Sequence, residues 1–190
     1  KTWRTDGTRT IPVVPGVMPG AADTFGSYGA EWGHVSNTPV SGYKQSNYEG
    51  GIITPLIVKW PGKIAAPGEI TQQVGHIIDV MPTCLAIAGG SYPKKYLDRD
   101  ILPVEGKSLL PIFAGKEREA HEALFWEYFG HRAVRSGDWK LVSPKDKPWE
   151  LYNLESDRGE LIDLAPQDPG RVKQLSALYQ AWSLRCNEGR

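Results

Sequence analysis

The hydrophobic pattern changes character along the chain. Residues 1–50 show no periodicity and are rich in glycine and proline, which predicts a long loop region. A loop of this length is unusual in a compact domain unless it lines a functional site or lacks its neighbours. Residues 52–60 then form a β-branched apolar run that Pro61 and Gly62 end, and this predicts a largely buried strand. Pro55 falls early in that strand, where a missing donor costs least.

Apolar positions three and four residues apart predict a helix over residues 76–88. Its apolar face is formed by Ile77, Ile78, Met81, Cys84, Leu85 and Ala88. Asp79 is the expected N-cap, and Pro82 is tolerated in the first turn. Gly89 and Gly90 supply the C-terminal stop. A strand followed by such a helix is typical of the end of an α/β sheet.

After a connecting region with a short helix at residues 108–113, the pattern predicts an antiparallel sheet. Its strands are expected at residues 123–129, 132–135, 139–142 and 149–153. Ser136-Gly137-Asp138 is a favourable hairpin turn between the second and third. A last helix should begin at Pro169 with Asp168 as its cap. Its apolar stripe, which should pack on the sheet, consists of Val172, Leu175, Leu178, Tyr179 and Trp182.

Composition and charge exclude several classes of protein. Hydrophobic residues make up 40% and charged residues 23% of the chain, which is typical of globular proteins. The 22 Lys and Arg balance the 22 Asp and Glu, so the basic excess of a nucleic-acid-binding domain is missing. No apolar run of about 18 residues predicts a membrane span, and no secretion signal opens the chain. The start at Lys1, without Met, favours a fragment or a processed piece.

The general catalytic and metal-binding motifs are missing. We find no G-x-S-x-G, P-loop, H-E-x-x-H or G-x-G-x-x-G, and no C-x-x-C or Cys/His metal spacing. The four histidines are scattered, and each alone favours ordinary hydrogen bonding over catalysis. Cys84, in an apolar run, is expected to be a free buried thiol, although a bridge to Cys186 stays open.

One loop lysine has an unusual setting. Lys44 stands in a glycine-containing turn, closely followed by Glu49-Gly50-Gly51 and the apolar run. Glycines let the backbone approach a ligand, and a loop lysine can hold an anion as a point charge. Taken as a residue alone, however, a solvated lysine is the simpler interpretation. Glu49 is expected to brace the Gly50-Gly51 turn by hydrogen bonds.

A succession of short motifs resembles the sulfatase family, in particular its arylsulfatase-like members. The motifs are S-N-T-P-x-x-x-Y-K from Ser36, E-G-G-I-x-T-P-L-I-V-x-W-P from Glu49, D-x-x-P-T from Asp79, G-x-S-L-x-P-x-x-x-G from Gly106, R-A-V-R-x-G-x-W-K-L from Arg132, W-E-L-Y-x-L from Trp149 and E-x-x-D-L-A from Glu160. Each match is weak by itself. Their order, from about residue 20 to residue 182, makes the resemblance specific.

The resemblance implies an alkaline-phosphatase-like α/β fold, of which this chain would be the C-terminal portion, α+β in itself. Residues 1–115 would form the last part of the catalytic α/β domain. Residues 116–190 would form a small C-terminal subdomain, an antiparallel sheet packed by the terminal helix. A sulfatase of this kind would be periplasmic or secreted if the source is bacterial.

The resemblance also implies a mechanism. Sulfatases convert the Cys or Ser of C/S-x-P-S-R to formylglycine, and a calcium ion held by Asp and Asn polarises the sulfate ester. Lys44 matches the family lysine that contacts the sulfate, so we expect it to be both catalytic and substrate-binding. Neither Cys84 nor Cys186 stands in the formylglycine motif. We therefore expect no metal ligand in this chain, and no activity of the chain alone. Where members often carry Arg, this chain has Ser41, a departure that concerns the contacts around Lys44.

Three further residues are weaker candidates for the substrate site. His34 and His131 are expected on loops that could face the cleft, and Trp32 could stack on an aryl or sugar group. For each, a purely structural role is the favoured interpretation.

Two other functions stay open beside sulfate ester hydrolysis. One is a phosphonate or phosphodiester hydrolase of the same superfamily. The other is a binding or assembly module, in which an exposed apolar strand edge would promote a homo-oligomer.

Overall fold

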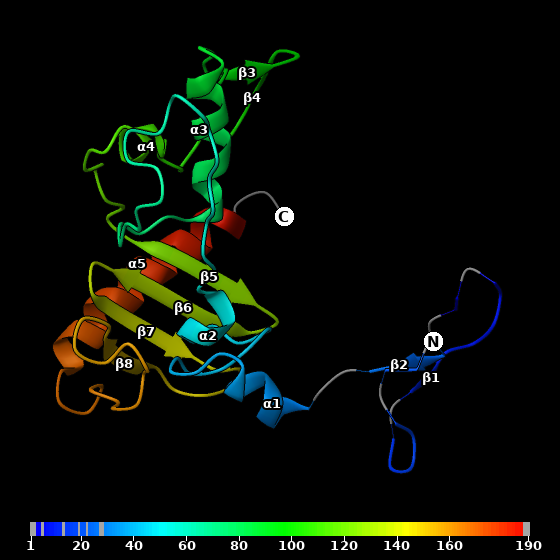
Figure 1. The fold of residues 1–190 in the computed structure, drawn as a ribbon. Helices are drawn as coiled ribbons and strands as arrows, with labels where there is room; N and C mark the ends of the chain where they lie inside the picture. Colours follow the sequence, from blue (N-terminus) through cyan, green and yellow to red (C-terminus); the bar gives the residue numbers. More distant parts are fainter. Residues whose placement is uncertain are drawn as a thin grey trace.

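A four-stranded antiparallel sheet in the order β5-β6-β7-β8 forms the centre of the fold (Figure 1). The computed structural model describes residues 3–4, 6–12, 14–18, 20–21, 23–26 and 29–187. The strands are β5 (Leu124–Tyr128), β6 (His131–Ser136), β7 (Trp139–Ser143) and β8 (Glu150–Asn153). The predicted sheet is confirmed, and so is the hairpin turn between β6 and β7.

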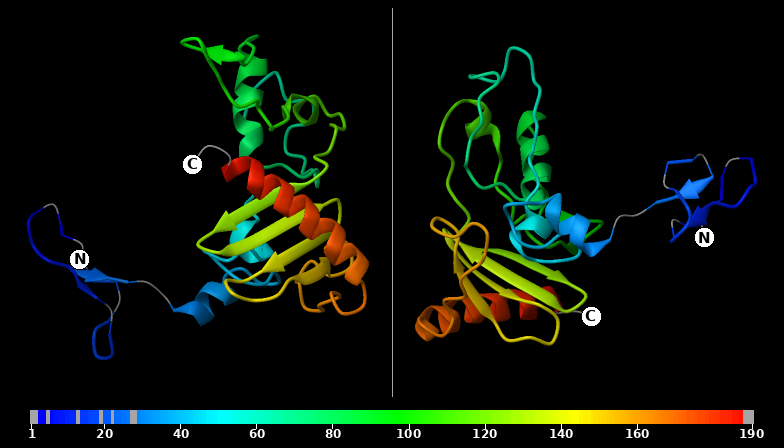
Figure 2. Two further views of the ribbon diagram at one scale, coloured as in Figure 1. Left: turned by 180° about the vertical axis from the view of Figure 1, so that it is seen from behind. Right: turned by 60° about the horizontal axis from the view of Figure 1, so that its bottom comes forward.

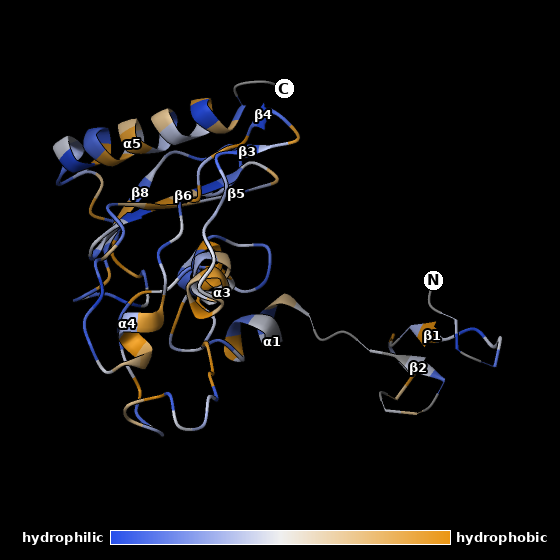
Figure 3. Ribbon diagram, turned by 90° about the horizontal axis from the view of Figure 1, so that it is seen from above, coloured by the Kyte–Doolittle hydropathy of each residue, from blue (hydrophilic) through white to orange (hydrophobic). Residues whose placement is uncertain are grey.

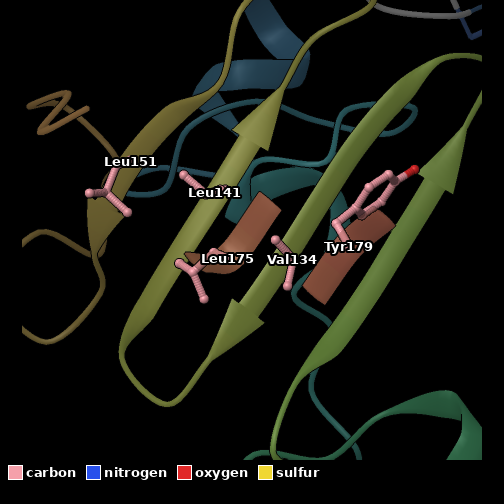
Figure 4. Close-up of a cluster of buried hydrophobic side chains, with 5 residues drawn as sticks. All are labelled: Val134, Leu141, Leu151, Leu175 and Tyr179. Carbon is pink, nitrogen blue, oxygen red and sulfur yellow. The ribbon is translucent and has the colours of Figure 1, made fainter. Parts of the chain in front are cut away.

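The long helix α5 (Pro169–Asn187) covers one face of this sheet (Figure 2). Asp168 caps it, because its Oδ1 accepts the backbone N–H of Arg171 at 2.9 Å. The apolar stripe meets β6, β7 and β8 in a buried cluster, whose members Figure 4 labels: Val134, Leu141, Leu151, Leu175 and Tyr179. The predicted C-terminal helix, its cap and its packing on the sheet are confirmed.

The opposite face of the sheet is covered by the segment that leads into the short helix α2 (Glu49–Ile52), as the right-hand view of Figure 2 shows. A second apolar cluster forms there, because neighbouring residues of a strand point to opposite faces. It consists of Ala133, Val142, Tyr152 and Leu154, with Tyr48 and Trp126 packed against them. The middle strands are therefore buried on both sides.

The predicted helix over residues 76–88 is confirmed as η1 (Ile77–Asp79) followed by α3 (Val80–Ile87). Asp79 occupies the N-cap position of α3, but its side chain makes no capping hydrogen bond to that helix. The His76 side chain accepts the N–H of Ile78, and the Asp79 carboxylate accepts the N–H of His76. This reciprocal pair is a capping box, which moves the start of the helix upstream of Asp79. The other short helix, α4 (Leu110–Phe113), lies where it was expected.

Much of the apolar face of α3 is not covered by the described residues, and Figure 3 shows the helix strongly hydrophobic. The expectation that Cys84 is buried is wrong for this reason, since its side chain lies exposed on that face. Cys84 and Cys186 are both free thiols, so they form no bridge.

The predicted strand at residues 52–60 is wrong. Ile52 ends α2, and residues 53–60 have no regular structure. A strand must pair its backbone with a neighbour, and within the described ranges no strand lies beside this segment. Ile53, Leu56 and Ile57 are consequently exposed, the last at 89%.

The predicted N-terminal loop contains short elements that periodicity cannot detect. These are β1 (Ile11–Pro12), which pairs with β2 (Thr24–Phe25), and the helices α1 (Ala30–Val35) and α2. A small hairpin, β3 (Lys95–Tyr96) and β4 (Arg99–Asp100), follows α3. Residues 1–2, 5, 13, 19, 22 and 27–28 of that loop lie outside the described residues, as do residues 188–190. Among the helices described, none has the length and apolarity needed to cross a membrane.

Candidate functional site

Lys44 lies at the tip of a tight turn. The Ser46 N–H donates to the Tyr43 carbonyl at 3.0 Å, and Gln45 adopts a left-handed φ of 79°. The loop closes at its neck, where the Gly50 N–H donates to the Ser41 carbonyl at 2.7 Å. The Lys44 side chain is exposed and makes no ion pair with any residue in the described part of the chain.

Gly50 and Gly51 lie so close to the backbone of residues 41–46 that no side chain fits at either position. A Cβ on Gly51 would lie 2.0 Å from the Ser46 carbonyl oxygen, and one on Gly50 would lie 2.4 Å from that of Gly42. Both distances are far below any van der Waals contact. The glycines therefore let the chain fold back under the Lys44 turn.

The turn borders an open pocket of about 620 Å³ against the C-terminal sheet. Besides Tyr43 and Lys44, its lining includes His131 at the start of β6, Glu150 and Tyr152 on β8, and Glu160. The fold thus brings Lys44 and His131 to one pocket, although they are far apart in the sequence.

Trp32 and His34 do not line this pocket. They lie on α1, so His34 is on a helix and not on the expected loop. The His34 Nδ1 accepts the backbone N–H of Gly42 at 3.3 Å, which ties α1 to the Lys44 turn. Trp32 is largely exposed on the same helix.

The pocket wall contains a carboxylate shared by two phenols. The hydroxyls of Tyr48 and Tyr152 both donate to Glu150 Oε2, the latter at 2.8 Å. Burial, and then the hydrogen bond to Glu150 and its negative charge, raise the pKa of both tyrosines far above the ordinary 10. Both phenols stay neutral donors at physiological pH, and Tyr48 fixes the Lys44 segment to β8.

Beneath the turn lies a buried group of three charges. Lys140 Nζ lies 2.8 Å from Glu49 Oε1 and 2.9 Å from Glu160 Oε1. The second contact is an ion pair only, and Glu160 Oε1 accepts no hydrogen bond. Glu160 Oε2 accepts the Glu49 N–H at 2.6 Å. Burial raises the pKa of Glu160, and Lys140 opposes that rise.

The expected role of Glu49 is therefore wrong. Its carboxylate does not brace the Gly50-Gly51 turn but binds Lys140 on β7. The turn is held instead by backbone hydrogen bonds, since Gly50 and Gly51 donate to Ser41 and Tyr48.

Another buried carboxylate, that of Asp79 at the end of η1, lies outside the pocket lining. Asp79 accepts hydrogen bonds from the backbone N–H groups of His76 and Lys107, from Arg118 Nη2 at 2.9 Å and from His121 Nε2 at 2.7 Å. Burial alone would raise the pKa of Asp79, but these hydrogen bonds together lower it. The Asp79 carboxylate therefore has a structural role: it joins the start of α3 to Lys107, Arg118 and His121 in the segment before β5.

The described residues do not fit a calcium site. Among them, no group of three or more His, Cys, Asp or Glu side chains is placed to hold a metal ion. The buried carboxylates are already bound, since Asp79 pairs with Arg118, and Glu49 and Glu160 pair with Lys140. We therefore derive no step of the chemistry through a metal bound by these residues.

Sequence reasoning assigned no role to several residues of this site: Tyr48, Lys140, Glu150, Tyr152 and Glu160. One signal was available. Lys140 stands between Trp139 and Leu141 in an apolar strand, and a charged residue there predicts either an edge or a buried ion pair.

Comparison with known proteins identifies the family. A family model described as N-sulphoglucosamine sulphohydrolase, C-terminal, matches residues 43–180. The chain belongs to this sulfatase family. The matched residues include the Lys44 turn, the buried charges and the whole four-stranded sheet. The family resemblance expected from the ordered motifs is thereby confirmed.

Individual relatives of this chain are also named as sulfatases. It is 33% identical over 163 residues to an uncharacterized sulfatase of Schizosaccharomyces pombe, covering 82% of this chain and 29% of that protein. It is 35% identical over 172 residues to human arylsulfatase A, covering 75% and 32%. The chain thus spans about a third of the length of these curated relatives.

A solved structure supports the expected fold class. The crystal structure of Ps i-CgsB superimposes with a TM-score of 0.64 at 24% identity, covering 77% of this chain and 32% of that one. At this identity the likeness concerns the fold. The expected mixed α/β fold with a small antiparallel sheet packed by a helix is confirmed.

Proposed function

We propose that this chain is part of a sulfuric ester hydrolase in which Lys44 binds the sulfate group. The observation that carries the proposal is that Lys44 is an exposed cation, without an ionic partner among the described residues, on a tightly held turn that borders a pocket. A fixed ammonium stabilises the charge that develops on the sulfate and leaving oxygens. Lys140, by contrast, is fully committed to two carboxylates.

The substrate class we propose is a sulfate ester of an aryl or carbohydrate alcohol. The relatives include human arylsulfatase A and, at 28% identity, an N-acetylgalactosamine-6-O-sulfatase of Bacteroides thetaiotaomicron. His131 lines the same pocket as Lys44, and we propose it as a second contact to the substrate. Trp32 and His34 are secondary proposals, since they lie on α1 beside the turn and outside the pocket.

The formylglycine and the calcium ion of sulfatases would have to come from other parts of the whole protein. Formylglycine would supply the nucleophile, and calcium would polarise the sulfate ester. The described residues provide neither a fitting metal site nor the nucleophile motif. We therefore propose that the chain alone is inactive, and measurable turnover of an aryl sulfate by it would contradict this. A periplasmic or secreted location, if the source is bacterial, is a proposal that rests on the family alone.

The proposal predicts that Lys44→Ala, made in the whole protein that contains this chain, lowers kcat on an aryl sulfate about 100- to 1000-fold. The reason is the loss of one fixed charge at the reacting group. Steady-state kinetics measure the effect, with Lys147→Ala as a control, because Lys147 is an exposed lysine outside the pocket. An unchanged rate in Lys44→Ala would contradict the proposal. Faster hydrolysis of a phosphodiester than of the sulfate ester would favour the alternative hydrolase.

A further inference from the structure

We propose that Lys140 is a positioning residue for Lys44, acting through Glu49 and Glu160. This inference deepens the function proposed above and rests on it. Lys140 lies on β7, and its ammonium contacts the two glutamates on the face of the sheet that carries the Lys44 segment. It touches neither the pocket nor Lys44 directly.

Burial makes the three charged side chains depend on one another. Lys140 is 0% exposed, Glu49 3% and Glu160 5%. Charged groups withdrawn from water to this degree require close ionic partners, and a lost partner leaves an uncompensated charge. The ammonium therefore fixes where both carboxylates lie. Because Glu49 belongs to the segment of Lys44, its position fixes the end of that segment.

The geometry of the loop connects this anchor to Lys44. Glu49 stands next to the neck, where Gly50 bonds to Ser41, and Lys44 stands at the tip. The same neck is held to the loop after β8 by the Ser41 hydroxyl, which donates to the Gly159 carbonyl at 2.6 Å. The Glu49 N–H reaches Glu160, whose left-handed φ of 55° only the surrounding contacts can maintain. The orientation of the tip thus depends on the anchoring of the neck.

Stability alone does not require a lysine at position 140. An apolar side chain at this position of β7 would continue the run of Trp139, Leu141 and Val142. Replacing buried ionic groups together by apolar ones is often neutral or stabilising. What the charges supply, and an apolar contact does not, is a directional link between β7 and the neck of the loop.

The deciding experiment is amide hydrogen exchange of the 190-residue chain carrying Glu49→Met. Methionine is similar in size to glutamate but carries no charge, so it cannot pair with Lys140. Lys140 keeps Glu160 as its partner in this variant. We expect amides of residues 42–51 to exchange about tenfold faster or more, while those of β6 and α5 keep their rates. Glu49→Gln, which can still accept a hydrogen bond from Lys140, should restore part of the protection.

The matched control is Glu155→Met, because Glu155 is exposed and its side chain contacts none of the three charges. It should leave exchange throughout the loop unchanged. Lys140→Met should accelerate the same amides, but it leaves two buried carboxylates without a cation and lowers overall stability as well. The decision therefore rests on Glu49→Met, and unchanged exchange at residues 42–51 in that variant would overturn the inference.

Kinetics of the whole protein separate this inference from the function on which it rests. Glu49→Met should lower kcat on an aryl sulfate about tenfold, yet cause no further loss when Lys44→Ala is already present, because residues acting through one another are not additive. Independent, multiplying losses would contradict a role through Lys44. If Lys44→Ala alone leaves the rate unchanged, the proposed function fails, while the exchange experiment still decides whether Lys140 anchors the loop.

Discussion

Two lysines near the pocket differ completely in their surroundings. Lys44 is exposed on a turn, whereas Lys140 is buried between two carboxylates. The sequence singles out Lys44 through the ordered sulfatase-like motifs around it, because the glycine-containing turn alone favours a solvated lysine. It does not reveal the partners of Lys140, because Glu49 lies 91 positions away, and strand alternation indicates a face but never a partner.

A titrating residue outside the pocket should make stability depend on pH. His76 accepts a backbone N–H at the start of η1, and its ring contacts Trp126 at a centroid distance of 5.2 Å. Burial lowers the pKa of His76 below the ordinary 6.5; Asp79 opposes this shift and His121 adds to it. The folded state therefore favours the neutral ring, and its stabilising contribution is full above about pH 6.5 and is lost as the pH falls from there towards the lowered pKa.

We therefore expect the free energy of unfolding, measured with urea, to be smaller at pH 5 than at pH 7.5. His76→Asn should reduce this difference, because Asn still caps the helix but does not titrate. His34→Asn serves as the control, since His34 is an exposed histidine on α1. The prediction fails if His76→Asn loses as much stability between the two pH values as the unchanged chain.

At the scale of elements, whether the sequence predicted a helix or strand depended on the length of the element and on how near its partner lies in the sequence. The sheet and α5 were predictable because alternation and helical spacing extend over whole elements, whose partners follow closely in the sequence. The helices α1 and α2 are too short for periodicity to reveal. Residues 52–60 have the composition of a strand, but strand formation requires a pairing neighbour that composition does not report.

The packing of α5 on the sheet gives a prediction for Leu175→Ala. Leu175 is 3% exposed in the cluster with Val134, Leu141 and Leu151. Truncation removes apolar contacts and leaves a cavity, so the free energy of unfolding should fall by about 2–5 kcal/mol. Urea denaturation measures the loss. Leu184→Ala on the same helix, 69% exposed, should change it by less than about 0.5 kcal/mol, and equal losses in both variants would contradict the packing described.

At the scale of the whole molecule, the chain divides into a well-packed and a sparsely covered part. The sheet is covered on both faces, whereas α3 and residues 53–60 expose apolar side chains. A domain boundary between residues 1–115 and 116–190 stays a prediction. Tyr48, which precedes that boundary in the sequence, packs on the sheet, which follows it. Self-association through the exposed surface is likewise a proposal.

Ile57→Lys should reduce that self-association. Ile57 is the most exposed apolar side chain of its run, and a charge there opposes contact between apolar surfaces. Sedimentation velocity across a concentration series should show less oligomer than the unchanged chain. Leu161→Lys adds the same charge at an exposed site elsewhere and should have no effect. Equal oligomer content in Ile57→Lys and the unchanged chain would exclude this surface as the contact.

The link between Glu49 and Glu160 has a consequence for synthesis on the ribosome. The two residues are separated by 111 positions. At a translation rate of about 5–20 residues per second, Glu160 is made on the order of ten seconds after Glu49. Throughout that interval, the nascent chain carries Lys44 on a segment whose anchor has not yet been made. The pocket is therefore among the last features of this chain to mature, and a chain stalled before residue 160 would display the lysine without the geometry that gives it a use.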